Sequence, residues 1–512
     1  MTRRMETTWA DKLGYAVDRA VGLVSPSWGM SRMAARTGMR SYRAAQNDRR
    51  GRGRGYGGDQ SADFHDEYDR ERLRSECRDA VRNDGFVKGM IRLSANNVLG
   101  HQEDPTGFQV RPKTPDEEWN QMATARLNDW ARRECDVYGH QTLRDMAATV
   151  YKEWKVAGEA LPLMLSKSPV SGKLQQVDAE RLVQPYGHTD EVPGEVRFGI
   201  QHARVSGRPM RYWIAPYSDR GYRVRTNDGQ WVHRMDMMHI FRKRRASQTR
   251  GVSELAPVLD DLEMMNQYSE AELMGAHVAA CAGIWVPSDY GSDNDFTTSH
   301  PDDDGDDSGY EHNQMEPGMI YRGSRTEGEP KVINPKKPPA QYGDFFEAQA
   351  RICMFALGIP LEMFSWGATS YSTARSAMLQ AYRTFRRDQM FLVEHFFRPV
   401  YRWKISQFIK HGDLRPPRTE DGERADAWAH SWIIPGWEWI NPLDEVRAAK
   451  MAVENGLSSW RDEVALKGKR IEDVVAENAD TLEKVDGLAE KHGLEDGDKI
   501  IDREAYRRSL SV

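Results

Sequence analysis

Three acidic residues near the middle of the chain have types and spacing that could bind a metal ion. Asp302, Asp304 and Glu311 follow His300 and flank Gly305, which nearly repeats the ligand spacing of a calcium-binding loop. The first ligand position holds His in place of Asp, and no helix pair is evident on either side. The carboxylates also share one Gly-rich run instead of coming from separate elements. We expect a flexible acidic loop here, with calcium binding as the alternative.

No other motif predicts catalysis. His65-Asp66-Glu67 could supply metal ligands, but adjacent side chains point in different directions, so a charged turn is expected. The sequence contains no GxxxxGK[ST] loop for nucleotide phosphates, no HExxH zinc motif and no GxSxG nucleophile elbow. We therefore expect no enzymatic activity and no cofactor. A metal-dependent nuclease built from the acidic cluster is the alternative.

Aromatic and basic residues gather in and after a loop at residues 358–372. A flat Trp side chain can contact sugars and bases without reading their sequence, and nearby cations attract phosphates. The candidate DNA-contacting residues are Phe364, Trp366, Gly367, Thr369, Ser370, Tyr371 and Arg375, together with Lys336 and Lys337 before the preceding helix. The alternatives are a buried Trp366 that locks the loop, and salt bridges between subunits for the basic residues, which continue at Arg383, Arg386 and Arg387.

Helices must support this loop on both sides. Apolar residues recur at helical spacing over 345–356, and Gly358 and Pro360 then end that helix. Ser370 and Ser372 can cap the next helix, whose pattern continues to Ile409. A kink is expected at Pro399.

The remaining segments mix helical and strand patterns. Helices are expected at 74–99, 119–134 and 253–286, and a helix that gives way to a strand at 150–165. Strands are expected at 195–200, 210–214, 222–224, 319–321 and 331–333, with Asn-Asp-Gly at 227–229 as a hairpin turn. These patterns predict an α+β chain of several packed units.

The composition suits an elongated, multi-domain subunit that completes its packing in an oligomer, and it also suits a soluble chain with disordered ends. Of 512 residues, 39% are hydrophobic and 29% charged, and the mean hydropathy is -0.75. A protein that grips DNA tightly would normally be basic, so the net charge of -6 does not favour such a protein. The four cysteines are far apart, so reduced thiols are expected, and neither a signal peptide nor an apolar membrane span is found.

Short blocks in a fixed order resemble the lambda-like family of tailed-phage portal proteins. The blocks are Arg78–Asp84, Asn96–Gly100, Gly158–Leu161, Gln176–Leu182, His239–Phe241, Gln248–Ser253, Leu357–Pro360 with Tyr371–Arg375, and Trp432–Trp437 with Ile440–Pro442. Each block alone is weak, but the ordered set is specific. The acidic insert near 293–307 departs from the family pattern, and the C-terminal region adds no match.

The resemblance implies a multi-domain portal fold, with a mostly helical stem and crown, a mixed α/β wing and a small β-containing clip. The expected parts are a basic flexible N-terminal arm at 1–60, the wing at 61–252, a stem helix at 253–287, the clip with its acidic loop at 288–339, a second stem helix at 340–357, the tunnel loop at 358–372, a long kinked helix and crown or wing return at 373–440, and a charged, partly disordered helical region at 441–512.

The resemblance also implies a structural function. A head–tail connector of this family forms a ring of twelve copies at one capsid vertex, through which DNA is packaged and ejected. The expected partners are double-stranded DNA bound without sequence preference, the terminase large subunit, a head–tail adaptor, and the major capsid and scaffold proteins, with no membrane. The expected location is the virion, after assembly in the host bacterial cytoplasm. A head–tail ring adaptor that does not contact DNA is a further alternative.

Overall fold

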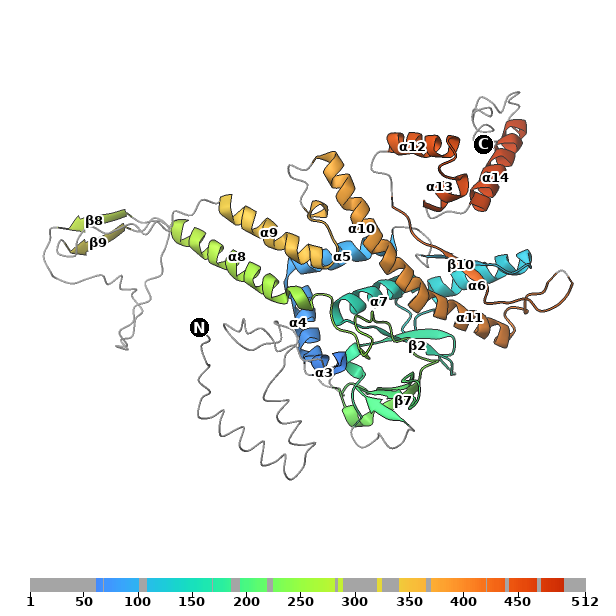
Figure 1. Ribbon diagram of the computed structural model, residues 1–512, viewed down its shortest axis with the longest axis horizontal. Coiled ribbons are helices and arrows are strands. Elements are labelled where there is room, and N and C mark those ends of the chain that lie inside the picture. The colour runs from blue at the N-terminus through green and yellow to red at the C-terminus, as the bar shows by residue number, and fades with distance from the viewer. Residues whose placement is uncertain are drawn as a thin grey trace, which may run out of the picture. The chain divides into compact units, whose positions relative to one another are not determined.

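The computed structural model describes residues 61–67, 69–100, 108–167, 169–185, 194–218, 224–280, 284–288, 320–324, 340–364, 370–419, 421–437, 442–466 and 471–491. They belong to two compact units, each described here by itself (Figure 1). The first unit is formed by residues 1–257 and 358–512, and the second by 258–357. The expected N-terminal arm and the acidic loop lie outside the described residues.

The first unit begins with a run of helices. They are α3 (Ala62–Asp66), α4 (Arg70–Asn83), α5 (Gly85–Leu99), α6 (Glu117–Arg133) and α7 (Leu143–Ala157). The prediction of a single helix over 74–99 is wrong, because the helix is interrupted at Asp84. The Asp84 carboxylate accepts hydrogen bonds from the backbone N–H groups of Phe86 and Val87 at 2.7 and 3.3 Å. This side-chain cap starts a second helix.

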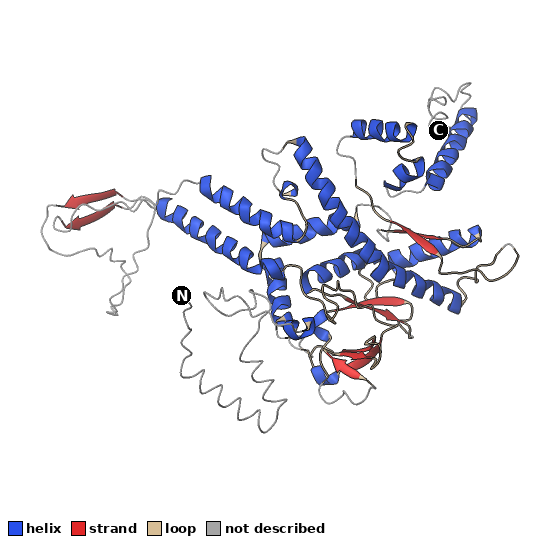
Figure 2. Ribbon diagram, in the orientation of Figure 1, coloured by secondary structure: helices blue, strands red, loops and turns tan. Residues whose placement is uncertain are grey.

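Small antiparallel sheets complete the first unit (Figure 2). One pairs β1 (Gln109–Pro112) with β10 (His430–Ile433), and another pairs β2 (Leu161–Leu165) with β3 (Lys173–Val177). A four-stranded sheet contains β4 (Glu195–Arg197), β5 (Ile200–His202), β6 (Pro209–Ile214) and β7 (Gln230–His233) in sequence order. The pairing of β1 with β10 joins segments more than 300 residues apart, so both ends of the unit share one fold.

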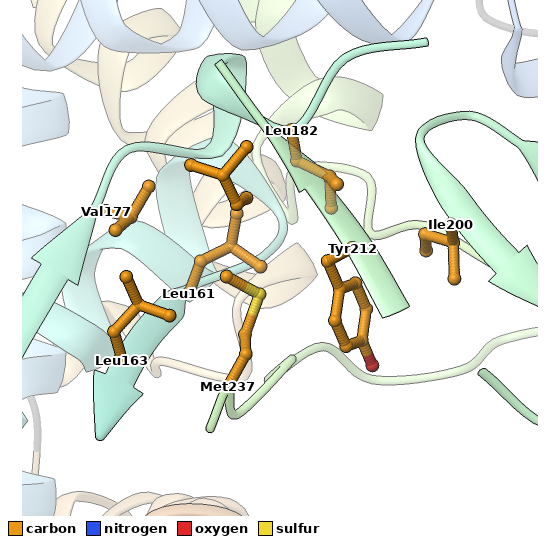
Figure 3. Packing of buried hydrophobic residues seen from close by; sticks show 8 residues of the cluster. Leu161, Leu163, Val177, Leu182, Ile200, Tyr212 and Met237 are labelled. Atoms are coloured by element: carbon orange, nitrogen blue, oxygen red, sulfur yellow. The ribbon is translucent and has the colours of Figure 1, made fainter. Parts of the chain in front are cut away.

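An apolar cluster joins the β2–β3 hairpin to the four-stranded sheet (Figure 3). Its buried members are Leu161, Leu163, Val177, Leu182, Ile200, Tyr212, Ile214 and Met237. Alternating strand residues supply most of them, since successive side chains of a strand point to opposite faces.

The Asn-Asp-Gly sequence at 227–229 is not the tight hairpin turn that was expected. Residues Thr226–Asp228 form a 3₁₀ turn that leads into β7, and β7 pairs with β6 across a longer connection. The Trp213 indole donates a hydrogen bond to the Thr226 carbonyl at 2.8 Å. A Cβ on Gly229 would lie 2.5 Å from this indole, so the close approach of Trp213 explains the glycine.

A helical run follows the loop of residues 358–372. It consists of α10 (Tyr371–Leu392), a π-helical turn over Val393–Phe397 and α11 (Arg398–His411). The kink expected at Pro399 stays a prediction. Pro399 lies in the first turn of α11, directly after the π-turn that interrupts the regular helical hydrogen bonding.

The expected helical C-terminal region contains α12 (Pro442–Glu454), α13 (Trp460–Leu466) and α14 (Ile471–Lys491). Residues 492–512 lie outside the described part. Among the described residues, no helix has the length and apolar character needed to cross a membrane.

The second unit contains two helices that lie side by side, α8 (Leu259–Ala280) and α9 (Ala340–Ala356) (Figure 1). Tyr268 contacts both Tyr342 and Phe345, with ring centroids 5.9 and 4.4 Å apart. β8 (Ile284–Ser288) and β9 (Ile320–Ser324) pair in parallel. The helix expected to continue to 286 is thus wrong at its end, where Ile284 and Val286 belong to a strand. The strand expected at 331–333 lies outside the described residues.

Candidate functional site

The expected DNA-contacting loop is described only at its two ends. Residues 365–369 lie outside the described part, so the structure does not place Trp366, Gly367 or Thr369. The other expected site residues outside it are Lys336, Lys337, the side chain of Tyr371, and the acidic candidates Asp302, Asp304 and Glu311 with His300 and Gly305.

The loop begins at Gly358, whose backbone conformation is fixed. Gly358 has a φ of +71°, and a Cβ there would lie 2.8 Å from the Thr384 side chain on α10. Only glycine fits this left-handed conformation and this close approach without strain. Farther on, the Phe364 side chain is 48% exposed, with its ring edge against Phe86 of α5 at a centroid distance of 5.3 Å. Phe364 therefore packs against α5 but remains partly exposed to solvent.

The loop enters α10 through a capped start. The Ser370 hydroxyl accepts a hydrogen bond from the Thr373 backbone N–H at 3.3 Å, as the sequence predicts for an N-cap. One turn later, the Arg375 guanidinium lies 3.6 Å from the Glu445 carboxylate of α12. The Arg375 side chain remains 39% exposed, so Glu445 lies close to its guanidinium without burying it.

The basic residues farther along α10 differ in their surroundings. Arg383 and Arg387 are exposed. Arg386 lies over the Trp437 ring at 5.4 Å from its centroid and donates a hydrogen bond to Gln389 at 3.3 Å. Burial lowers the pKa of Arg386. Arg386 therefore belongs to the packing of the first unit, while Arg383 and Arg387 can meet a phosphate.

A buried ionic network fixes the second half of α10. The Asp388 carboxylate is within 2.7 Å of the Lys155 ammonium and 2.8 Å of the Arg242 guanidinium, and the Tyr151 hydroxyl donates to it at 3.2 Å. Lys155 also pairs with Glu254 at 2.6 Å. Burial and then Asp388 raise the pKa of Tyr151 well above its ordinary value. The partners saturate one another, so the network is suited to positioning and not to catalysis.

Gln389 adds a second anchor to the same turn. This fully buried side chain donates from Nε2 to the carbonyls of Val98 and Pro435, both at 3.0 Å. Close by, the Trp437 ring stacks on Tyr382 at 4.4 Å, and its N–H donates to the Asn97 carbonyl at 3.1 Å. The end of α5 and the segment that contains Pro435 and Trp437 are thus joined through α10.

A second buried network surrounds Glu159, which has no solvent exposure. Arg250 Nε donates to both carboxylate oxygens at 2.9 and 2.8 Å, His239 lies 2.8 Å away, and the Gly251 N–H donates at 3.2 Å. Burial alone would raise the pKa of Glu159, but Arg250 and His239 hold that pKa well below its ordinary value. Burial lowers the pKa of His239.

The sequence did not predict the residues of these two networks as part of the site. The blocks that carried the family resemblance converge on the network around Glu159. Glu159 comes from one block, His239 from another and Arg250 from a third, and Arg250 also donates to the carbonyls of Leu182 and Ala179. The available signal was a lone charged residue inside an apolar block, such as Glu159 in Gly158–Leu161.

The described residues contain no group of three or more His, Cys, Asp or Glu side chains placed to hold a metal ion. At the sequence His65-Asp66-Glu67, Asp66 is buried and Glu67 is exposed. Cys77, Cys135 and Cys353 are buried, and burial raises the pKa of Cys77 and of Cys135 to about 12. The Cys77 and Cys135 thiols are therefore poor nucleophiles.

Comparison with known proteins supplies the family context. Residues 48–389 match the sequence model of "Phage portal protein, lambda family". The probable portal protein of Halomonas phage phiHAP-1 is 24% identical over 425 residues, which cover 79% of each chain. Portal protein B of Escherichia phage lambda is 22% identical over 79% of this chain and 82% of its own length.

Chains in solved structures of gene transfer agent particles are also similar to this chain, with low TM-scores and low sequence identities. A chain from the neck of an empty particle has a TM-score of 0.41 and 14% identity, covering 78% of this chain and 93% of its own. A chain from the neck of a native particle has a TM-score of 0.39 and 13% identity, with the same coverage.

Proposed function

Because this chain belongs to the lambda family of phage portal proteins, we propose that it forms the ring at one vertex of a phage head through which DNA enters and leaves. The observation that carries this proposal is the family match over residues 48–389. The portal proteins of phages phiHAP-1 and lambda align with this chain over about four fifths of their length, so the similarity extends beyond a shared module.

Exposed apolar residues on the second unit support assembly into a ring. Leu273 and Met274 of α8 are 60% and 59% exposed, and Ile352 and Phe355 of α9 are 51% and 81% exposed. Large apolar side chains that stay exposed on both helices can be covered by another protein. We assign this cover to adjacent copies of the same chain, in a closed ring of twelve.

The parts of the ring follow from the family resemblance. α8 and α9 would be the stem, the segment between them with β8 and β9 the clip, and residues 61–252 the wing. Residues 358–372 would be the tunnel loop. Residues 373–440 would return through α10 and α11 to the wing and crown, and 441–512 would form a charged helical region.

The tunnel loop would face the channel and touch DNA without sequence preference. Phe364, half exposed at one end, and Arg375, exposed enough to meet a phosphate at the other, are its described candidates. Trp366, Gly367, Thr369, Ser370 and Tyr371 complete the loop contacts, and Lys336 and Lys337 would add phosphate attraction. A weak, repeated contact of this kind retains DNA without stopping its movement.

The ring would have a structural role and no catalytic one. We expect it to dock the terminase large subunit, which would supply ATP hydrolysis, and later a head–tail adaptor. The major capsid and scaffold proteins would surround it during assembly in the host cytoplasm.

Substitution of Trp366 tests the DNA contact. We expect Trp366→Ala to leave ring assembly intact and to lower DNA packaging or retention, measured as packaged genome per particle. Trp428→Ala is the matched control, because Trp428 is 53% exposed and lies in a different segment. If Trp366→Ala instead prevents folding or assembly, the indole is buried and locks the loop. If packaging is unchanged, the loop does not contact DNA.

A further inference from the structure

Two arginines on α4 are buried without a hydrogen-bonding partner. Arg70 and Arg74 lie one turn apart on the same helix face and are only 7% and 8% exposed. Among the described residues, neither guanidinium has a hydrogen bond or an ion pair, and Nε and Nη1 of Arg70 are enclosed with no acceptor. Buried donors in native proteins are almost always satisfied, so a missing partner calls for an explanation.

Two carboxylates whose charges reach these arginines are already bound by other groups. The charge of Glu159 acts on both arginines, but its two oxygens accept hydrogen bonds from Arg250, His239 and Gly251. The charge of Glu180 also reaches Arg74, but that carboxylate is 2.6 Å from Arg78. Neither carboxylate forms an ion pair with Arg70 or Arg74.

The surroundings of Arg70 disfavour its charged form. Burial, followed by the charge of Arg250, lowers the pKa of Arg70 to about 10, and the same two causes lower the pKa of Arg74. Arg70 lies over the Phe198 ring at 4.9 Å. The ring face attracts a cation but accepts none of the in-plane hydrogen bonds that a guanidinium offers.

We propose that Arg70 and Arg74 form an oxyanion-binding site, which takes a phosphate or a carboxylate between their guanidinium groups. The planar fork of N–H donors on arginine matches the oxygens of either group. The oxyanion has two possible sources, a free phosphate ion and an acidic side chain of an adjacent copy. The site goes beyond the proposed function, because both arginines belong to one chain and a free anion can bind them without a ring.

Thermal unfolding of the full-length monomer in inorganic phosphate, at constant ionic strength set with chloride, tests the site. We expect phosphate at a hundredfold excess over its Kd to raise the wild-type Tm by about 5 °C. Arg70→Met and Arg74→Met should lose this response. Arg82→Gln should keep it, because Arg82 is an exposed arginine on the same helix.

The order of stabilities provides a second readout. Without phosphate, Arg70→Met should be at least as stable as the wild type, because it removes a buried charge that forms no ion pair. With phosphate, the wild type should be the more stable protein. If phosphate raises the Tm of both the monomer and the assembled ring, the site takes a free anion. If phosphate raises the Tm of the monomer alone, a carboxylate from the adjacent copy occupies the site in the ring.

Equal phosphate responses of the wild type and both Met variants, or no response of the monomer, would overturn the proposal. If Arg70→Met does not fold, Arg74→Met and calorimetric titration of the wild type with phosphate decide the question. Absence of binding heat then rejects the site.

Discussion

At the scale of single residues, the first unit encloses several charged side chains. Lys404 of α11 illustrates the cost of enclosure. Its side chain is 7% exposed, its ammonium lies 4.8 and 4.6 Å from the ring centroids of Trp130 and Phe408, and it donates to the Gly172 carbonyl at 3.2 Å. Burial lowers the pKa of Lys404 to about 8, although Glu134 and Asp413 oppose the shift.

This shift predicts a stability that rises with pH. Lysine in an unfolded chain has a pKa of about 10.4, so between roughly pH 8 and 10 the unfolded state binds more protons than the folded state. The free energy of unfolding should therefore increase over this range, with an upper bound of about 3 kcal/mol from Lys404. Urea unfolding at pH 7 and pH 9.5 measures the increase.

Lys404→Met is the control for this titration. Other groups contribute equally to both proteins, so the difference between wild type and variant isolates Lys404. The variant should gain less stability on going from pH 7 to pH 9.5. An equal gain in the two proteins would show that Lys404 does not titrate in this range.

The sequence predicted residue types at the site better than their surroundings. Ser370 was expected to cap α10, and it does. Arg386 belonged to the same basic stripe as Arg383 and Arg387, but it is held against Trp437, a residue far away in sequence. Helical spacing shows which side chains share a face, but long-range packing decides which of them solvent reaches.

At the scale of elements, α10 is fixed at one end and exposed at the other. Asp388 and Gln389 anchor its last turns, whereas Ser372, Thr373 and Ser376 near its start are exposed. The π-turn over Val393–Phe397 follows the anchored turns directly. The helix can therefore hold the preceding loop in place from a rigid base.

Removing the Asp388 charge should make the last turns of α10 unfold locally more often. Asp388→Asn leaves Lys155 and Arg242 without their shared buried counter-charge, and such a loss typically costs about 3–5 kcal/mol. We expect faster amide hydrogen exchange throughout residues 371–392, measured by mass spectrometry.

Glu394→Gln is a matched control for the Asp388 variant. Glu394 pairs with Arg398 on the helix surface, so its removal should change stability by no more than about 0.5 kcal/mol. Exchange in α10 that responds equally to both substitutions would contradict an anchoring role for Asp388.

Helix positions were largely predictable from periodicity, but their interruptions were not. The helix expected at 119–134 corresponds to α6, whereas the one expected at 74–99 is divided at Asp84 and the one at 373–409 contains a π-turn. An Asp inside a helical pattern can cap or continue the helix, and packing selects between these outcomes. The pairing of β1 with β10 lies beyond any local pattern.

At the scale of the whole molecule, the ordered family blocks predicted the protein's class, and the family match confirms it. The reason is physical. Those blocks contain Glu159, Arg250 and the segments that Gln389 joins, so they record the contacts that hold the fold together. The clip and the tunnel loop carry few such contacts among the described residues, and their roles stay predictions.

The exposed apolar residues of the second unit lead to an assembly prediction. Phe355→Glu places a charge where the side chain is 81% exposed, so the folded monomer should change in stability by no more than about 0.5 kcal/mol. Burial of that charge between copies would be costly, and ring formation should be lost in native mass spectrometry.

Arg351→Gln on the same helix is the control, because Arg351 is also exposed and its loss adds no charge to the interface. We expect this variant to assemble. Rings formed by Phe355→Glu with wild-type yield would remove α9 from the proposed interface.

Electron cryomicroscopy of the purified full-length chain under assembly conditions tests the central claim most directly. We predict closed rings of twelve copies with an axial channel wide enough for double-stranded DNA and with residues 364–371 at the channel wall. A chain that stays monomeric under all assembly conditions, or rings whose centre is too narrow for DNA, would contradict the account.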